Sequence, residues 1–312
     1  MTDSPKGSNK RNTITTAGSN PDVGGAYPQI YRTSLQERLT GPTNWKEICE
    51  VVYSKSQFIN LPYMSTEYTL QSGTRGSAYS HSDFTITNDQ LRINNIDVIS
   101  TFMDRADVAQ FSLADWSEHG ARQADVIMER VEDLFLAQYT GMTDFGSDGA
   151  GGFGLAATQI TITVANIDNV VRAIKREIVK AKGGKLAKKN GIFIVWRAED
   201  MEKLEENMAS QGYTFADQAL RDGVQNADGI GKYAFGVWHY ESESHTALHV
   251  VAGVRKIQQL GLLSTTYDNP TFWPNAVNAD GPLSGSSMES RLDYGWNPKA
   301  GLTALLFDVN VT

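Results

Sequence analysis

The chain has 312 residues, which is enough for one large hydrophobic core or two modest ones. Its formal net charge is −8, which argues against a dedicated DNA-binding protein, whose summed field should be positive. The single cysteine, Cys49, excludes an intrachain disulfide, and apolar neighbours favour a buried side chain over a nucleophile. There is no apolar segment typical of a secretory signal, and no apolar run approaches the ~18 residues of a membrane span.

The N-terminal residues 1–28 are rich in Ser, Thr, Asn, Gly and Pro and hold almost no large apolar side chains. A segment of this composition buries too little apolar surface to offset its ordering entropy. We therefore expect a flexible N-terminal arm, reaching at most to residue 44. Lys10 and Arg11 make its tip basic and are candidates for contacts with a neighbouring copy.

Residues 45–65 follow as a lead-in segment. Trp45, Ile48, Val51 and Val52 recur at helical spacing, which predicts a short amphipathic helix.

Residues 66–104 carry strand-like alternation on both sides of a turn-rich stretch at 72–77. The segment is polar for its length, and a long polar hairpin is not stable standing alone. We expect it to lie on another surface, including that of a neighbouring copy. Arg75 and Tyr79, near its tip, are candidates for that contact.

The strongest helix signal covers residues 115–139, within a unit spanning 105–160. Asp115 is a good N-cap, with Glu118 three residues on, as in a capping box. A helix of ~25 residues would be ~37 Å long, a beam on which other elements pack. Its apolar stripe consists of Ala121, Ala124, Ile127, Met128, Val131, Leu134 and Phe135.

Glycine-rich residues 146–154 invite comparison with a phosphate-binding loop. They lack the Gly-Lys-Ser/Thr ending that supplies the phosphate-binding lysine, and the long helix precedes them instead of a strand. A flexible connector is the favoured interpretation.

An α/β layer is expected within residues 161–262. Helices are predicted at 166–182 and 198–209, on either side of a continuously apolar strand at 191–196 that should be covered on both faces. Further strands are predicted at 233–238, at 247–252 and in the tail at 303–311, the last within return strands of residues 263–312.

A basic run lies on and after the first of these helices. A solvated helix face is the ordinary interpretation of such a run. Contact with an acidic neighbour is the functional one, with the acidic third helix as a candidate partner, and sequence-independent contact with packaged DNA is another. The contact candidates are Arg172, Lys175 and Arg176 on the basic side and Glu202 and Glu205 on the acidic side.

A metal site is the alternative that would imply an enzyme. His239, Glu241, Glu243 and His245 alternate, so they could share one face of a strand, with His249 close behind. Residues 241–246 also look like a solvated turn, which would break that common face. No Gly-x-Ser-x-Gly elbow and no pair of carboxylates stands out. We expect no catalytic, cofactor-binding or metal-binding residues.

The order of these parts resembles the major capsid proteins of tailed bacteriophages, the Hong Kong 97-type fold, and also the related encapsulins. Residues 91–110 look like the second strand of that family's extended loop and its lead into the spine helix. Residues 124–131 resemble the spine helix, 167–208 the helix–strand–helix of the axial domain, and 255–260 the return to the peripheral domain.

The resemblance implies an α+β subunit with an N-arm, an extended hairpin loop, a spine helix, and peripheral and axial domains. It implies self-assembly as homo-pentamers and homo-hexamers into an icosahedral head shell around double-stranded DNA, built in the host cytoplasm, without a membrane. A portal protein, a scaffolding protein and a decoration protein are the implied partners. An encapsulin-like cellular nanocompartment is the alternative.

Two departures from the family's pattern narrow these expectations. Some members cross-link a loop lysine to a neighbour's asparagine, but residues 64–104 contain no lysine. Shell stability should then be non-covalent or helped by decoration proteins. Only about 28 polar residues precede the first ordered candidates, too few for a built-in helical scaffold, so we expect a separate scaffolding protein.

Overall fold

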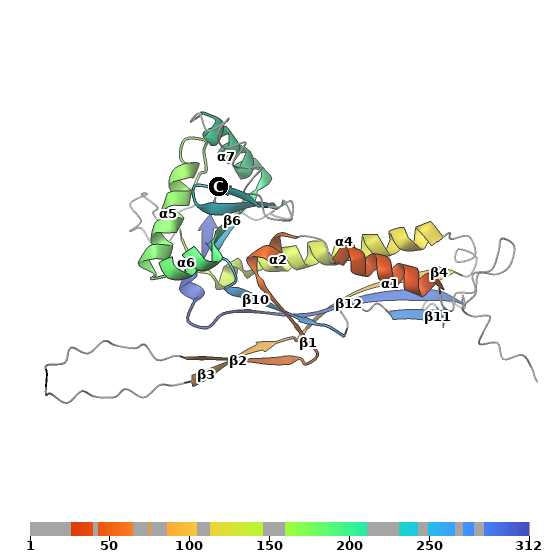
Figure 1. The fold of residues 1–312 in the computed structure, drawn as a ribbon. Coiled ribbons are helices and arrows are strands. Elements are labelled where there is room, and N and C mark those ends of the chain that lie inside the picture. The colour runs from red at the N-terminus through yellow and green to blue at the C-terminus, as the bar shows by residue number, and fades with distance from the viewer. Residues whose placement is uncertain are drawn as a thin grey trace, which may run out of the picture.

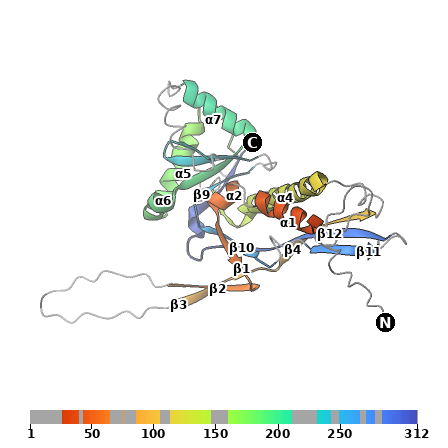
Figure 2. The ribbon, with the colours of Figure 1, turned by 45° about the vertical axis from the view of Figure 1, so that its right-hand side comes forward.

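A computed structural model of the chain (Figure 1) describes residues 26–39, 43–64, 75, 86–104, 113–145, 160–210, 231–242, 249–265, 271–277 and 284–311. The predicted connector at 146–154 lies outside these residues. The described parts form two lobes, each built around one sheet, and a two-stranded hairpin beside the lower lobe (Figures 1 and 2).

The lower lobe is a five-stranded sheet. Its strands are β1 (Glu50–Ser54), β4 (Asn95–Asp104), β10 (Gln258–Leu263), β11 (Thr271–Val277) and β12 (Ser284–Pro298). The long strand β12 is its centre, because β10, β11 and β4 all pair with it antiparallel, and β1 pairs parallel with β10. Helices α1 (Ala26–Leu39) and α4 (Leu113–Leu136) pack against each other above this sheet (Figure 1).

A buried polar network ties these two helices to the sheet. The Tyr31 hydroxyl of α1 donates to the Gln123 side-chain oxygen on α4 and lies 2.8 Å from the Ser290 hydroxyl on β12. The Gln123 amide nitrogen donates to the Thr101 hydroxyl on β4 at 3.1 Å. Burial raises the pKa of Tyr31 to about 12, so its hydroxyl stays protonated as a donor.

Helix α1 corrects the predicted extent of the flexible arm, which ran to residue 44. Residues 26–39 are helical, and Tyr31, Leu35 and Leu39 bury their side chains against α4. Their spacing of four residues places them on one face of a helix. Polar residues lie between these three positions, so the composition of the segment alone does not reveal the apolar stripe.

The predicted helix at Trp45–Val52 is also shorter than expected. Helix α2 (Asn44–Ile48) ends at Ile48, and Val51 and Val52 belong to β1, where they pair with Leu260 and Gly261 of β10. Pairing with a strand two hundred residues away overrides the helical spacing.

The hairpin is placed differently from the predicted 66–104 unit. Strand β2 (Phe58–Met64) begins before that unit and pairs antiparallel with β3 (Ile86–Arg92). Strand β4 then leaves the hairpin and pairs with β12 over ten residues, from Asn95–Tyr294 to Asp104–Gly285. Strand β3 of the hairpin is therefore followed directly along the chain by strand β4 of the lower sheet.

The predicted long helix is confirmed as α4, which continues into the short 3-10 helix η1 (Ala137–Gly141). It begins at Leu113, so Asp115 lies inside its first turn and the predicted N-cap is wrong. Ala124, Ile127, Val131 and Phe135 of the predicted stripe are buried.

The upper lobe is a six-stranded sheet of order β5-β13-β9-β6-β8-β7. Its strands are β5 (Thr143–Asp144), β6 (Ile192–Arg197), β7 (Lys232–Ala234), β8 (Val237–Ser242), β9 (His249–Val254) and β13 (Leu306–Asn310), the last preceded by the 3-10 turn η2 (Thr303–Leu305). Helices α5 (Ile167–Lys180), α6 (Gly184–Asn190) and α7 (Ala198–Ser210) pack against this sheet.

The predictions for α5, β6 and α7 are confirmed, whereas α6 was not predicted. Ile192 to Trp196 of β6 are all buried, as a strand covered on both faces requires. The predicted strand at 233–238 is two strands, because Phe235 and Gly236 both adopt positive φ and form a hairpin turn between β7 and β8.

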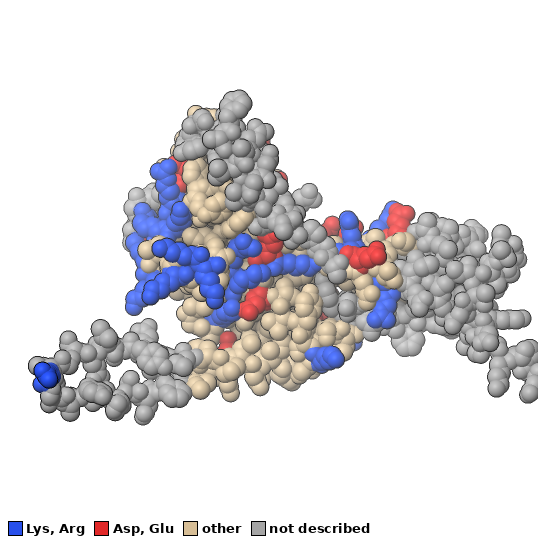
Figure 3. Space-filling model, in the orientation of Figure 1, with Lys and Arg blue, Asp and Glu red and all other residues tan. Residues whose placement is uncertain are grey.

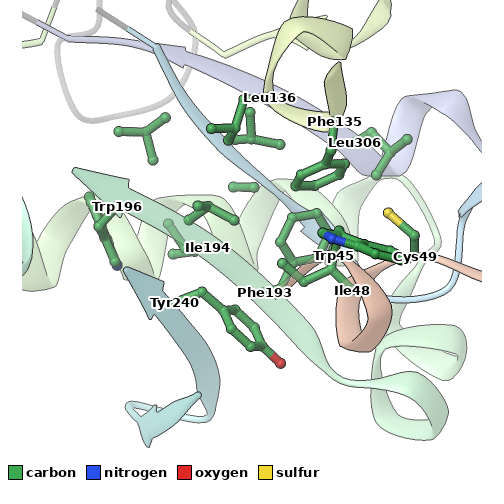
Figure 4. Close-up of a cluster of buried hydrophobic side chains, with 14 of the residues drawn as sticks. Trp45, Ile48, Cys49, Phe135, Leu136, Phe193, Ile194, Trp196, Tyr240 and Leu306 are labelled. Carbon is green, nitrogen blue, oxygen red and sulfur yellow. The ribbon is translucent and has the colours of Figure 1, made fainter. Parts of the chain in front are cut away.

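The core is continuous between the lobes (Figure 4). Trp45 and Ile48 of α2 are fully buried beside Phe193 of β6, and Phe193 lies 6.4 Å from the Phe135 ring of α4. Cys49 is also fully buried, and burial raises the pKa of its thiol, so it is a core residue as predicted.

Candidate assembly surfaces

The hairpin β2–β3 carries apolar side chains that are largely exposed to solvent. Phe58 is 56% exposed and Ile86 is 60% exposed. At its base, Leu91 is fully buried and Ile93 nearly so, where the chain crosses the lower sheet. The hairpin is therefore anchored at one end, and the rest of the described strands carries exposed apolar surface.

Two glycines allow this anchoring. A Cβ on Gly295 of β12 would lie 1.9 Å from the Arg92 carbonyl oxygen, and one on Gly261 of β10 would lie 3.0 Å from the Leu91 side chain. Only a residue without a side chain permits the backbone to cross at Gly295.

The lower sheet has a second exposed apolar area on β4. Asp97 and Ile99 point toward α4, where Asp97 binds Arg130 at 2.8 Å and Ile99 packs on the core. The alternate residues Ile96 and Val98 therefore lie on the opposite face, where they are 54% and 50% exposed. The alternation of Ile96 and Val98 with Asp97 and Ile99 along the strand is visible in the sequence and indicates two differently exposed faces.

A basic surface covers α5 and α6 (Figure 3). Arg172 binds Asp168 at 3.2 Å, and Arg176 and Lys180 both bind Glu177. Lys175 donates to the Phe235 carbonyl at 2.6 Å. Four further lysines are exposed and have no ion pair with any described residue: Lys182, Lys185, Lys188 and Lys189.

An acidic surface lies on α7. Asp200 is fully buried and is held by Arg197 and Lys203, and Glu205 binds Lys232 of β7. The remaining carboxylates, Glu199, Glu202 and Glu206, are exposed and make no ion pair with the described residues. Within the described parts of one chain, no ion pair joins the acidic α7 to the basic α5, although the helices touch.

The remaining contact candidates are only partly placed. Arg75 is exposed. Tyr79, Lys10 and Arg11 lie outside the described residues. Their roles stay predictions.

The alternative metal site is opposed by the hydrogen bonding of His239. The Trp196 indole donates to its Nδ1 at 2.9 Å, so Nε2 carries the proton and donates to the Ala234 carbonyl at 3.1 Å. Burial lowers the pKa of His239 to about 4. Neither nitrogen is free to bind a cation. His249 is engaged elsewhere, bound to Asp308 at 2.9 Å.

Of the other members of that set, Glu241 is exposed, and Glu243 and His245 lie outside the described residues. The described residues hold no cluster of three or more potential metal ligands. None of the helices in the described stretches combines the length and the apolarity that a membrane crossing requires.

Comparison with known proteins gives a match in structure only. No protein-family model matches the chain, and no curated protein sequence gives a significant match. The mature capsid of bacteriophage PhiM1 aligns with a TM-score of 0.55 at 15% identity, covering 87% of both chains. A structure from Gordonia phage Cozz aligns at 0.56 and 10% identity, covering 96% of this chain and 97% of that one.

A virus-like particle from Pyrococcus furiosus matches similarly. Its TM-score is 0.54 at 8% identity, over 90% of this chain and 98% of that chain. At such identities the likeness establishes the fold alone. The chain has the mixed α+β, Hong Kong 97-like fold of these shell-forming proteins.

Proposed function

We propose that the chain is the major capsid protein of a tailed bacteriophage, a non-enzymatic subunit that assembles into the head shell. The observation that carries the proposal is a whole-chain likeness to phage capsid subunits, combined with a hairpin that leaves Phe58 and Ile86 in water. Apolar surface of this kind, on an element with little support from its own chain, is typical of an interface.

We infer the finer parts of the proposal from the resemblance to capsid subunits. The subunits form homo-pentamers and homo-hexamers on an icosahedral lattice that encloses double-stranded DNA. A portal protein, a separate scaffolding protein and a decoration protein complete the particle, which is assembled in the host cytoplasm. Heterologous contacts that close by rotation are the general way in which such rings form.

In the proposed assembly the hairpin lies on a neighbouring copy. Its exposed apolar side chains then gain a partner surface, for which the area around Ile96 and Val98 is a candidate because it is also exposed and apolar. Burying apolar surface contributes roughly 25 cal/mol per Å².

Electron microscopy and light scattering of the purified protein, with and without a scaffolding protein, test the proposal. We expect shells or capsomers from the natural chain and a marked loss of both from the double variant Phe58→Ser/Ile86→Ser. Both side chains are exposed, so the variant's unfolding free energy should stay within about 0.5 kcal/mol of the natural chain's.

A matched control is Val126→Ser on α4, where Val126 is 51% exposed. It replaces an exposed apolar side chain outside the hairpin by the same residue, although it removes less apolar surface than the double variant, and it should leave assembly unchanged. A natural chain that stays monomeric under all assembly conditions would refute the proposal.

A cellular nanocompartment is the second candidate, because 98% of the Pyrococcus virus-like particle subunit is covered. The two functions differ in the content and symmetry of the particle. Particles purified from the native source should contain DNA and one unique portal vertex if the chain is a capsid protein. A protein cargo in a particle with twelve equivalent vertices would favour the compartment.

A further inference from the structure

We propose that the basic surface of α5 and α6 in one copy docks against the acidic surface of α7 and β7 in the next copy around a ring. The inference rests on the proposed function, because it names the surfaces that join copies within a pentamer or hexamer. It requires two different, complementary surfaces on one lobe.

The first observation is an exposed apolar side chain inside the basic surface. Val179 of α5 is 64% exposed, the highest value among the large apolar side chains of the described residues. Arg176, Lys180 and Lys182 flank it along the chain, and the start of α6 approaches its methyl group. An apolar centre with a charged rim is the composition of a protein interface. A surface on which lysines bind phosphate groups would not require an exposed apolar side chain at its centre.

The second observation is an apolar hollow on the acidic side. It lies between α7 and β7 and has Glu205 and Lys232 at its rim. Tyr233 at this site is 39% exposed. The apolar lining is Met201, Leu204, Met208, Tyr233 and Ala234. The exposed Val179 and the methionine-lined hollow are both apolar, and methionine side chains adapt readily to a neighbouring apolar group.

The third observation is charge. Between Asp168 and Lys189 the chain carries eight Lys and Arg and two acids, whereas α7 carries five acids and one lysine. Among the described residues of one copy, no ion pair joins a side chain of the basic surface to one of the acidic surface. Opposite potentials on docking surfaces steer association and fix its register.

The dimensions of the two surfaces also agree. Arg172, Arg176 and Lys180 recur every four residues and span about 12 Å of helix, and the stripe from Glu199 to Glu206 spans about 10 Å. Both views of the ribbon show α6 and α7 at opposite ends of the upper lobe (Figures 1 and 2). Helix α5 touches α7 at one end, so the part of the basic surface that can face a neighbour alone is α6 with the end of α5 around Val179. One copy can offer that part to one neighbour and its acidic surface to the other, as a heterologous ring requires.

Disulfide trapping tests the contact directly. Cys49 is buried, so a pair of introduced cysteines gives the only exposed thiols among the described residues. In assembled shells, Val179→Cys combined with Tyr233→Cys should give a covalent ladder on a non-reducing gel, ending at five or six copies. Each single variant should give no ladder. The control pair Val126→Cys with Tyr233→Cys should also give none.

Charge reversal tests the pairing. Lys185→Glu/Lys188→Glu and Glu202→Lys/Glu206→Lys should each weaken ring formation about tenfold, because each places like charges opposite one another. The chain that carries all four substitutions should recover, because attraction is restored in the reversed sense. Circular dichroism and thermal unfolding confirm that each variant is folded.

The outcomes separate this inference from the proposed function. If natural shells form but the cysteine pair gives no ladder, the docking inference is wrong and the capsid proposal stands. If Lys185→Glu/Lys188→Glu assembles normally into empty shells but retains less DNA, the basic surface faces the genome and the inference is overturned. If the natural chain forms no shells, the proposed function itself fails.

Discussion

The close crossing at Gly295 gives a sharp test of how the hairpin is held. Replacing Gly295 with Ala places a Cβ 1.9 Å from the Arg92 carbonyl oxygen and 2.7 Å from the Arg92 carbonyl carbon. These are backbone atoms, which cannot rotate away as a side chain would, so β3 must move off the sheet. Overpacking of this kind costs about 1–3 kcal/mol.

The loss should be local to the hairpin base. The Ile93 amide donates to the Gln57 carbonyl at 2.8 Å, and this hydrogen bond reports on the crossing. If opening there becomes easier by the same free energy, the amide exchanges with deuterium about 5- to 150-fold faster. Native-state hydrogen exchange measures this rate, and urea unfolding measures the change in global stability.

A graded series makes the result decisive. Gly261→Ala meets side-chain atoms only, of Leu91 at 3.0 Å and of Ile93 at 3.2 Å, among its nearest neighbours and should cost less than Gly295→Ala. Gly141→Ala meets nothing within 4 Å and serves as the control. Equal exchange rates at Ile93 in all three variants and the natural chain would refute the anchoring role of the glycines.

Three further predictions follow from buried residues. Leu35→Ala should lower the unfolding free energy by about 2–5 kcal/mol in urea titrations, because Leu35 is fully buried under α4; an effect below 1 kcal/mol would mean that α1 is not packed. Tyr31→Phe removes the hydroxyl next to Gln123 and should cost about 1–3 kcal/mol by the same measurement. The depressed pKa of His239 means that its neutral form stabilises the fold fully above pH ~6.5 and that this stability is lost as pH falls toward about 4. His239→Gln should flatten the difference in stability between pH 7 and pH 5, and an unchanged difference would contradict it.

The sequence predicted the elements whose signal is local. Helices α5 and α7 carry apolar stripes at helical spacing, and β6 is a continuous apolar run, so each could be located within a few residues. These elements form the body of the upper lobe, and the basic and acidic residues on α5 and α7 were correctly placed on helices.

The predictions that failed concern segments whose pairing strands lie far away in the chain. Val51 and Val52 fit a helix locally but pair with β10, and β4 reads as part of the hairpin but pairs with β12. Sequence spacing carries no record of these pairings. Val179 is different, because it sits beside Ile178 but off the buried stripe of α5, and that offset is visible in the sequence.

The number of covalent links between the lobes has a mechanical consequence. The chain passes between the two sheets three times, from α4 into β5, from β9 into β10, and from β12 into β13. At the shortest passage, Lys256 donates to the carbonyls of Lys46 and Cys49 at 2.8 and 2.9 Å, which fastens the turn to the C-terminal end of α2. Three separate covalent links leave no single axis about which one lobe could swing. In the proposed shell, each subunit would then behave as one stiff body, and differences in curvature would be accommodated at the contacts between subunits.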